Sequence, residues 1–103
     1  MLHRLVRSPI VALNRSIAAG NALGPEEGLA ELRKIPDSDK LKEYPFYPAA
    51  HGEFHLQADR PVEAATHFEQ ALKLARSQSE RNFFERKLEA CRLSAGESKT
   101  SDG

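Results

Sequence analysis

Prolines divide this sequence into short segments, and each segment carries apolar residues at the spacing of a helix. Proline is well tolerated at the first position of a helix, where its missing N–H leaves no bond unmade, but it ends a helix when it comes later. Pro36 stands where a helix is expected to stop, because the residue before a proline is pushed out of the helical region. The other five prolines stand at expected helix starts: Pro9, Pro25, Pro45, Pro48 and Pro61.

About five helices are expected between these breaks. They begin at Ser8–Pro9, at Pro25, near Pro45, at Pro61 and at Ser77. The stretch Ser77–Glu80 fits a capping box, in which the serine bonds forward and the glutamate bonds back. The link from Asp37 to Tyr44 is charged and is expected to be a loop with room for one helical turn. Because no segment shows the alternation of a strand, the predicted fold class is all-α.

The apolar residues of these segments define the expected core. In the first helix they are Ile10, Leu13 and Ile17. In the last helix the residues expected to face inward are Phe83, Phe84, Leu88 and Cys91. Beyond Leu93 the residues are small and polar, which is typical of disorder. We therefore expect one helical domain over residues 1–93 and a disordered polar tail over residues 94–103.

Charge and composition exclude several classes of function. The chain has 15 basic and 15 acidic residues, so it lacks the positive surface of a nucleic-acid binder. No apolar run approaches the roughly 20 residues that span a bilayer, and the start lacks the features of a signal peptide. Cys91 is the only cysteine, which rules out an intrachain disulfide and favours a reducing compartment. We expect a cytoplasmic protein without direct nucleic-acid or membrane contact.

An internal repeat organises the chain. The spacing Gly52…Ala64-x-x-x-Phe68-x-x-Ala71 matches the tetratricopeptide repeat (TPR). Its small residues let the two helices of a hairpin approach closely, and its aromatic residue is expected to fill the space between neighbouring hairpins. The pattern recurs 36 positions earlier as a weaker match, at Gly28, Leu32 and Ile35. The predicted fold is a set of TPR-like antiparallel helical hairpins with right-handed solenoid-type packing and a C-terminal capping helix.

The front of this predicted array has no cap. Each hairpin of such an array buries its apolar face against a neighbour, so both ends need covering. The fifth helix covers the back, whereas Leu2, Leu5 and Val6 look like the last turn of an earlier helix. We therefore expect that the chain is the C-terminal piece of something longer, or else that it self-associates through its uncapped N-terminal end.

Three stretches carry a sharper resemblance than the generic repeat: Ser8–Arg15, Arg60–Leu72 and Glu80–Leu88. They resemble the C-terminal TPR-like region that a group of bacterial extracytoplasmic-function (ECF) RNA polymerase sigma factors carries after its promoter-binding domains. The resemblance implies a regulatory protein-interaction module whose partner is the upstream sigma domains, RNA polymerase or a regulator. It also implies that this chain by itself reads no promoter. The alternative is an independent TPR-like scaffold or adaptor protein.

The repeat also predicts which residues contact a partner. In a TPR-like array the first helix of each hairpin lines the concave side, which can hold an extended or helical peptide. In the second hairpin the candidate groove residues are Phe46, Ala49, Glu53, Leu56 and Gln57. Asn14 and Arg15 lie in the most specific block of the resemblance and are candidates for an inter-domain contact. The alternative for this pair is a structural hydrogen bond or ion pair between helices.

No arrangement of residues points to catalysis or to a bound cofactor. His51 and His55 have the four-residue spacing of a metal-binding pair, yet the residue after the first histidine is Gly52 and not glutamate. Both occupy repeat positions where leucine and tyrosine are usual, so we expect structural histidines. An enzyme or metal protein that uses this pair is the third alternative. Cys91 is expected in the core, and Asp59 stands at a turn where the resembled family more often has glycine.

Overall fold

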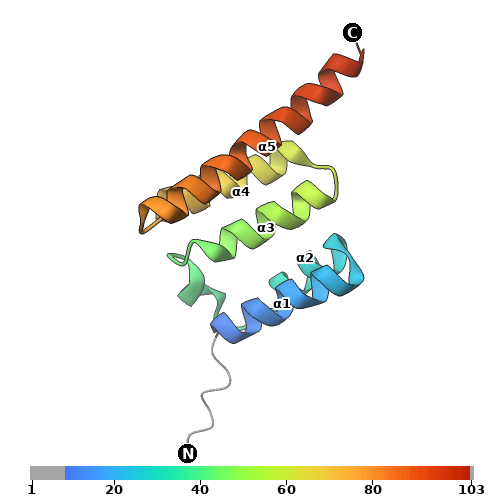
Figure 1. Ribbon diagram of the computed structural model, residues 1–103. Coiled ribbons are helices and arrows are strands. Elements are labelled where there is room, and N and C mark those ends of the chain that lie inside the picture. Colours follow the sequence, from blue (N-terminus) through green and yellow to red (C-terminus); the bar gives the residue numbers. More distant parts are fainter. Residues whose placement is uncertain (1–8, 103) are drawn as a thin grey trace, which may run out of the picture.

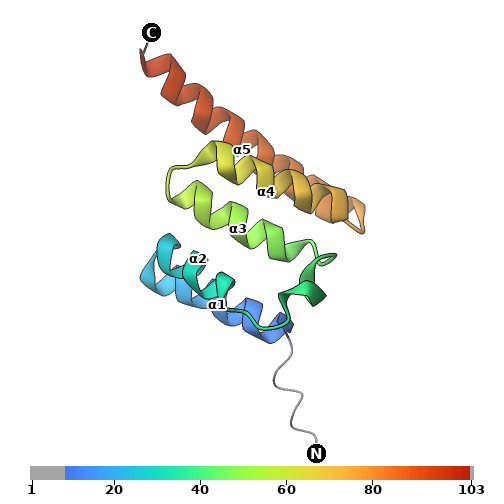
Figure 2. The same ribbon diagram turned by 180° about the vertical axis from the view of Figure 1, so that it is seen from behind.

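The computed structural model describes residues 9–102, with side chains up to Gly96. This part of the chain forms five α-helices and one 3₁₀ helix and contains no strand. The elements are α1 (Pro9–Leu23), α2 (Pro25–Arg33), η2 (Ser38–Leu41), α3 (Phe46–Gln57), α4 (Pro61–Leu74) and α5 (Gln78–Asp102). Neighbouring α-helices pack side by side in chain order (Figures 1 and 2). The predicted all-α class and number of helices are confirmed.

Prolines set the helix boundaries much as the sequence predicts. Pro9, Pro25 and Pro61 are the first residues of α1, α2 and α4. Helix α3 begins one residue after Pro45, and η2 is the helical turn expected in the link before it. These boundaries follow from local backbone chemistry, since proline fixes φ and offers no N–H to the preceding turn.

Two tight turns pass through a residue with positive φ. Gly24, between α1 and α2, has a φ of 115°, a conformation that side chains rarely adopt. Asp59, between α3 and α4, has a φ of 66°. Its N–H donates to the carbonyl of Leu56 at 3.1 Å, and the N–H of Arg60 donates to the carbonyl of His55 at 2.8 Å. This is the bond pattern of a Schellman turn, so aspartate here takes the left-handed position that glycine more often fills.

The start of α5 is capped by side chains, with one change from the prediction. Ser77 Oγ accepts a hydrogen bond from the N–H of Glu80 at 3.2 Å, which is the forward bond of the predicted capping box. The carboxylate of Glu80 accepts from the backbone N–H of Arg76 at 2.8 Å, one residue earlier than in the standard box. It also accepts from the Arg76 side chain at 2.8 Å, which ties the turn to the helix.

The core consists of two clusters that lie on either side of α3. The first joins α1, α2, η2 and α3 through Leu13, Leu29, Leu32, Ile35, Leu41, Ala50 and Phe54. The second joins α3, α4 and α5 through Ala49, Ala64, Phe68, Ala71, Phe84 and Cys91. Phe46 packs partly buried against both. The seven repeat residues expected to pack, from Gly28 to Ala71, are all buried.

Phe54 fills the space between α3 and the first two helices, which corrects the role expected for Phe68. A Cβ atom placed on Gly20 would lie 2.2 Å from the Phe54 ring, and one on Gly28 would lie 2.5 Å from it. The ring therefore occupies room that only two glycines leave. Phe68 packs instead over Gly52 within its own helix pair and toward α5. The aromatic residue between the pairs comes from the first helix of a pair, not the second.

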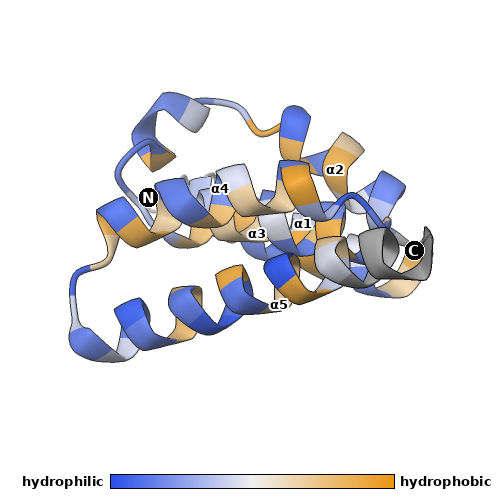
Figure 3. Cartoon of the chain, turned by 90° about the horizontal axis from the view of Figure 1, so that it is seen from above, coloured by the Kyte–Doolittle hydropathy of each residue, from blue (hydrophilic) through white to orange (hydrophobic). Residues whose placement is uncertain are grey.

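Some residues expected to face inward are exposed. Ile10 and Phe83 each keep 42% of their surface, whereas Leu13, Phe84 and Cys91 are fully buried. Adjacent residues of a helix point about 100° apart, so Phe83 and Phe84 face different directions, and only Phe84 is turned into the core. Most of α5 is hydrophilic (Figure 3), and none of the described helices is long and apolar enough to cross a membrane.

Helix α5 continues to Asp102, beyond Leu93, where the domain was expected to end and a disordered tail to begin. The division into a domain over residues 1–93 and a tail over residues 94–103 stays a prediction. Composition alone suggested disorder, but extending an existing helix needs only propagation and not a new nucleus. The segment contains no proline that would stop it. Gly103 and the predicted uncapped turn at Leu2, Leu5 and Val6 lie outside the described residues.

Candidate functional site

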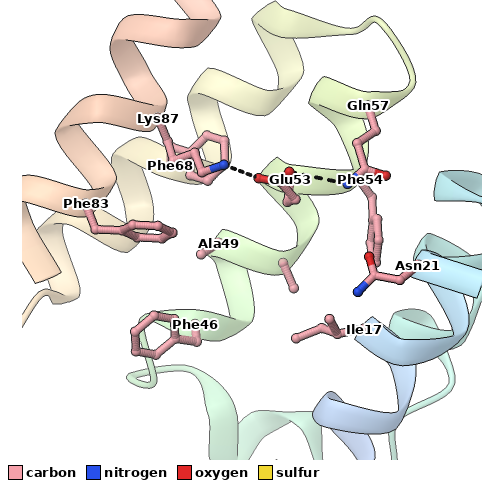
Figure 4. Close-up of a pocket in the computed structure, with 11 residues that line it drawn as sticks. Ile17, Asn21, Phe46, Ala49, Glu53, Phe54, Gln57, Phe68, Phe83 and Lys87 are labelled. Carbon is pink, nitrogen blue, oxygen red and sulfur yellow. Dashed lines mark hydrogen bonds and ion pairs between the residues drawn. The ribbon is translucent and has the colours of Figure 1, made fainter.

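Helices α1, α3 and α5, together with Phe68 of α4, line an open groove of about 340 Å³, with α3 as its floor. Figure 4 shows α1 side chains on one side of α3 and α5 side chains on the other. The lining is mainly apolar and includes two partly exposed phenylalanines. Its residues are Ile17, Asn21, Phe46, Ala49, Ala50, Glu53, Phe54, Gln57, Phe68, Phe83 and Lys87.

Four of the five predicted groove residues line this groove: Phe46, Ala49, Glu53 and Gln57. The fifth, Leu56, does not line it. Leu56 is partly buried and packs against the second core cluster. The first helix of the second pair therefore presents one face to the groove, as the repeat predicts.

The remaining lining residues come from α1 and α5, from α3 itself (Ala50 and Phe54) and from α4 (Phe68), and none of them was predicted to line the groove. The repeat offset would have found two of them, because Ile17 and Asn21 lie 36 positions before Glu53 and Gln57. In the other direction, Phe83 and Lys87 lie 34 positions after Ala49 and Glu53. Side chains of α1, at an offset of 36, and of α5, at an offset of 34, thus meet those of α3 at one surface.

The charged groups of the groove pair with each other. Lys87 Nζ lies 2.7 Å from Glu53 Oε1, which joins α5 to α3. Gln57 Nε2 donates to the other oxygen of Glu53 at 3.3 Å. Lys87 Nζ also lies 5.6 Å from the centre of the Phe83 ring, within range of a cation–π contact. The groove therefore presents a neutralised polar end beside an apolar surface.

Buried Phe84 lies behind the apolar end of the groove. The rings of Phe46 and Phe83 both contact buried Phe84, at centroid distances of 5.6 and 5.5 Å. Aromatic pairs at such tilted geometries stabilise each other beyond their burial alone. Phe83 keeps 42% of its surface exposed. An exposed aromatic held in place by a buried one can meet a partner without first losing much side-chain freedom.

Asn14 and Arg15 lie outside the groove. Both side chains are exposed on α1, and Arg15 borders a separate shallow hollow between α1 and α2. Within residues 9–96 neither side chain makes a hydrogen bond or an ion pair, so the interhelical bond considered from the sequence is not found there. The inter-domain contact stays a prediction.

The histidines His51 and His55 occupy the face of α3 opposite the groove, and His67 of α4 joins them. The His67 ring stacks on the rings of both, each at a centroid distance of 5.1 Å. Burial, and then the neighbouring His67, lowers the pKa of His51 to about 4. No group of side chains in the described part of the chain is arranged to hold a metal ion. The sequence analysis missed His67, because it lies on another helix.

Cys91 lies in the second core cluster, as predicted. Burial, followed by the charge of Glu53, raises the pKa of its thiol above the ordinary value, so the reactive thiolate is disfavoured.

Comparison with known proteins places a similar stretch inside a longer chain. A protein of Rhizobium meliloti (strain 1021), named only as uncharacterized, is 36% identical to this chain over 88 residues. The similarity covers 85% of this chain and 20% of that protein, so the chain spans about a fifth of its relative's length. No protein-family profile and no solved structure matches the chain.

Proposed function

We propose that this chain is a protein-interaction module that binds a polypeptide segment in the groove of α1, α3 and α5. The observation that carries the proposal is the convergence of side chains from three helices on one surface, of which Phe46, Ala49, Glu53 and Gln57 were predicted from the repeat. Catalysis has no part in the proposal.

The proposal includes a TPR-like architecture, with two antiparallel hairpins in a right-handed solenoid and α5 as the capping helix. Equivalent burial at an offset of 36 supports it. Buried positions correspond in pairs: Leu13 and Ala49, Ser16 and Gly52, Gly28 and Ala64, Leu32 and Phe68, Ile35 and Ala71. The ion pair between Glu26 at the start of α2 and Arg60 at the start of α4 (2.8 Å) further supports parallel stacking of the second helices.

The chemistry of the groove defines its ligand class. A large apolar side chain of the ligand would lie on Phe46, Phe83 and Ile17. The amides of Asn21 and Gln57 can each donate and accept, so they suit a peptide backbone or a polar side chain. Because Glu53 and Lys87 neutralise each other, the groove favours an uncharged, amphipathic segment over a strongly acidic or basic one.

A matched pair of neighbouring residues tests the groove. Peptides are selected from a random 12-residue library on the purified chain, and their affinities are measured by fluorescence anisotropy. Phe83→Ala should weaken the selected peptides at least tenfold, because it removes an exposed aromatic contact. Arg86→Ala, on the exposed side of α5, should leave them unchanged. Equal affinities for wild type and Phe83→Ala would refute the assignment of the groove.

Within this class, we propose that the module is the regulatory C-terminal region of an ECF-type sigma factor. The resemblance of Ser8–Arg15 and Glu80–Leu88 supports it, as does the relative in which a similar stretch is only a fifth of the protein. Two separate probes test it: RNA polymerase core enzyme, and the promoter-binding domains of an ECF sigma factor that carries such an extension. Binding to either that Phe83→Ala weakens supports the proposal. If peptides bind the groove but neither probe does, the independent adaptor is favoured.

A further inference from the structure

Three imidazole rings form a continuous stack between α3 and α4. His67 lies between His51 and His55, with interplanar angles of 18° and 4°. The ring of Tyr47 closes the stack edge-on against His51, at a centroid distance of 5.0 Å. Stacked rings this close repel one another when they carry charge, because two unit charges in a partly buried site interact strongly.

Arg60 connects this stack to the first helix pair. Its Nε–H donates to His55 Nδ1 at 3.1 Å, and its Nη1 donates to Glu26 of α2 at 2.8 Å. The bond to Nδ1 needs the lone pair of a neutral imidazole. Protonation of that nitrogen removes the acceptor and sets a cation against the guanidinium. The bond between α3 and Arg60 therefore exists only while His55 has its Nδ1 free, whereas the Arg60–Glu26 ion pair does not depend on it.

The charged groups around the stack offset each other. From α2 they are Glu26 and Arg33, and from α4 and its start they are Glu63 and Arg60. No excess of negative charge faces the rings from the two helices packed against them, so nothing nearby favours an imidazolium. Burial contributes in the same direction for His51, His55 and His67.

We propose that His51, His55, His67 and Arg60 form an acid-sensitive latch, which fastens α3 to α4 while the imidazoles are neutral and loosens when they are protonated. The latch is on the face of α3 opposite the groove. Residues of the stack alternate along α3 with the groove residues Glu53 and Gln57, so loosening at one face shifts the floor of the other. The latch does not depend on any partner and is tested without one.

The direction of the pH effect follows from the lowered pKa values. The unfolded chain binds protons near the ordinary histidine pKa of 6.5, whereas folded His51 binds them only near pH 4. Stability is therefore full above about pH 6.5 and is lost as the pH falls toward 4. For His51, and discounting for its partial exposure to solvent, the equilibrium constant for unfolding should rise about tenfold to thirtyfold between pH 7.5 and pH 5.

Urea unfolding of the full chain at pH 7.5 and at pH 5 tests the titration. The wild type should show the tenfold to thirtyfold rise. His51→Phe, which keeps a flat ring but cannot titrate, should show a clearly smaller rise. His3→Asn removes the fourth histidine, which lies outside the described residues, and should behave like the wild type. A wild-type rise of less than threefold, or an undiminished rise in His51→Phe, would overturn the proposal.

Amide hydrogen exchange tests whether the loosening is local. Protection factors are compared at pH 7.5 and pH 5, so that the pH dependence of intrinsic exchange cancels. Protection at pH 5 should fall in α3 and α4, which the stack joins, and persist in α1 and α2. His55→Asn, whose side-chain oxygen can still accept from Arg60 but does not titrate, should reduce this fall. A uniform fall over all helices, or the same fall in His55→Asn, would mean that acid destabilises the fold without opening a latch.

Discussion

Replacing Gly28 by alanine should have two opposing effects on the stability of the fold, each of known size. Gly28 lies inside α2, where alanine is favoured over glycine by about 0.5–1 kcal/mol. However, a Cβ atom at this position would lie 2.5 Å from Cε2 and 2.6 Å from Cζ of Phe54. The ring cannot move away, because its other edge lies against Gly20, where a Cβ would be only 2.2 Å distant. Overpacking of this kind costs about 1–3 kcal/mol, so the net effect should be a destabilisation of roughly 0.5–2 kcal/mol.

Urea unfolding followed by circular dichroism measures this difference as a lower midpoint at unchanged slope. Phe54→Leu frees space beside Gly28, so the two changes should not add. The double variant Gly28→Ala with Phe54→Leu should lose at least about 0.5 kcal/mol less unfolding free energy than the two single variants lose together. Gly96→Ala is the matched control: it also places alanine in a helix, and no atom lies within 4 Å of the new Cβ. It should be neutral or slightly stabilising. If Gly28→Ala stabilises the chain, or if the two changes add, the close packing around Phe54 is refuted.

Three further changes test other parts of the structure. Asp59→Gly should stabilise the chain by up to about 1 kcal/mol, and Asp59→Val should destabilise it by about 1–2 kcal/mol, because only glycine is unstrained at positive φ. Equal midpoints of thermal unfolding would contradict the positive φ at Asp59. Phe84→Ala should lower the free energy of unfolding by about 3–5 kcal/mol, because the ring is fully buried. Phe83→Ala should lower it by about 1 kcal/mol or less. Comparable urea midpoints of the two variants would mean that the exposed and buried faces of α5 are misassigned. Hydrogen bonds from Arg76 lower the pKa of Glu80, so the carboxylate stabilises the fold above its ordinary pKa and loses this effect as the pH falls through the lowered value. Stability of a Glu80→Gln variant should therefore depend less on pH below about pH 4.5. An unchanged dependence of stability on pH would contradict the cap.

Local sequence chemistry determined where the helices begin and end. Proline at the first helical position, glycine or aspartate at a positive φ, and serine at a cap each act through the backbone within a few residues. For this reason the boundaries at Pro9, Pro25 and Pro61 and the forward bond from Ser77 could be predicted without knowledge of the fold. The repeat spacing added one face of α3, because helical periodicity fixes which residues share a face.

Contacts between helices could not be read in the same way. The burial of Phe54 depends on two glycines that lie 34 and 26 positions away in the sequence. The histidine stack needs His67, which only the pairing of α3 with α4 brings to His51 and His55.

Some features of the groove could likewise be predicted from the sequence, whereas others depend on the tertiary structure. Phe46, Ala49, Glu53 and Gln57 follow from the period of one helix, and the sequence by itself determined that they share a face. The tertiary structure decided the rest: α1 and α5 complete the groove, Leu56 turns toward the core, and Phe83 stays exposed while Phe84 is buried. The physical reason is that a helix has more apolar positions than its neighbours can cover, and only the arrangement of those neighbours selects which positions are buried.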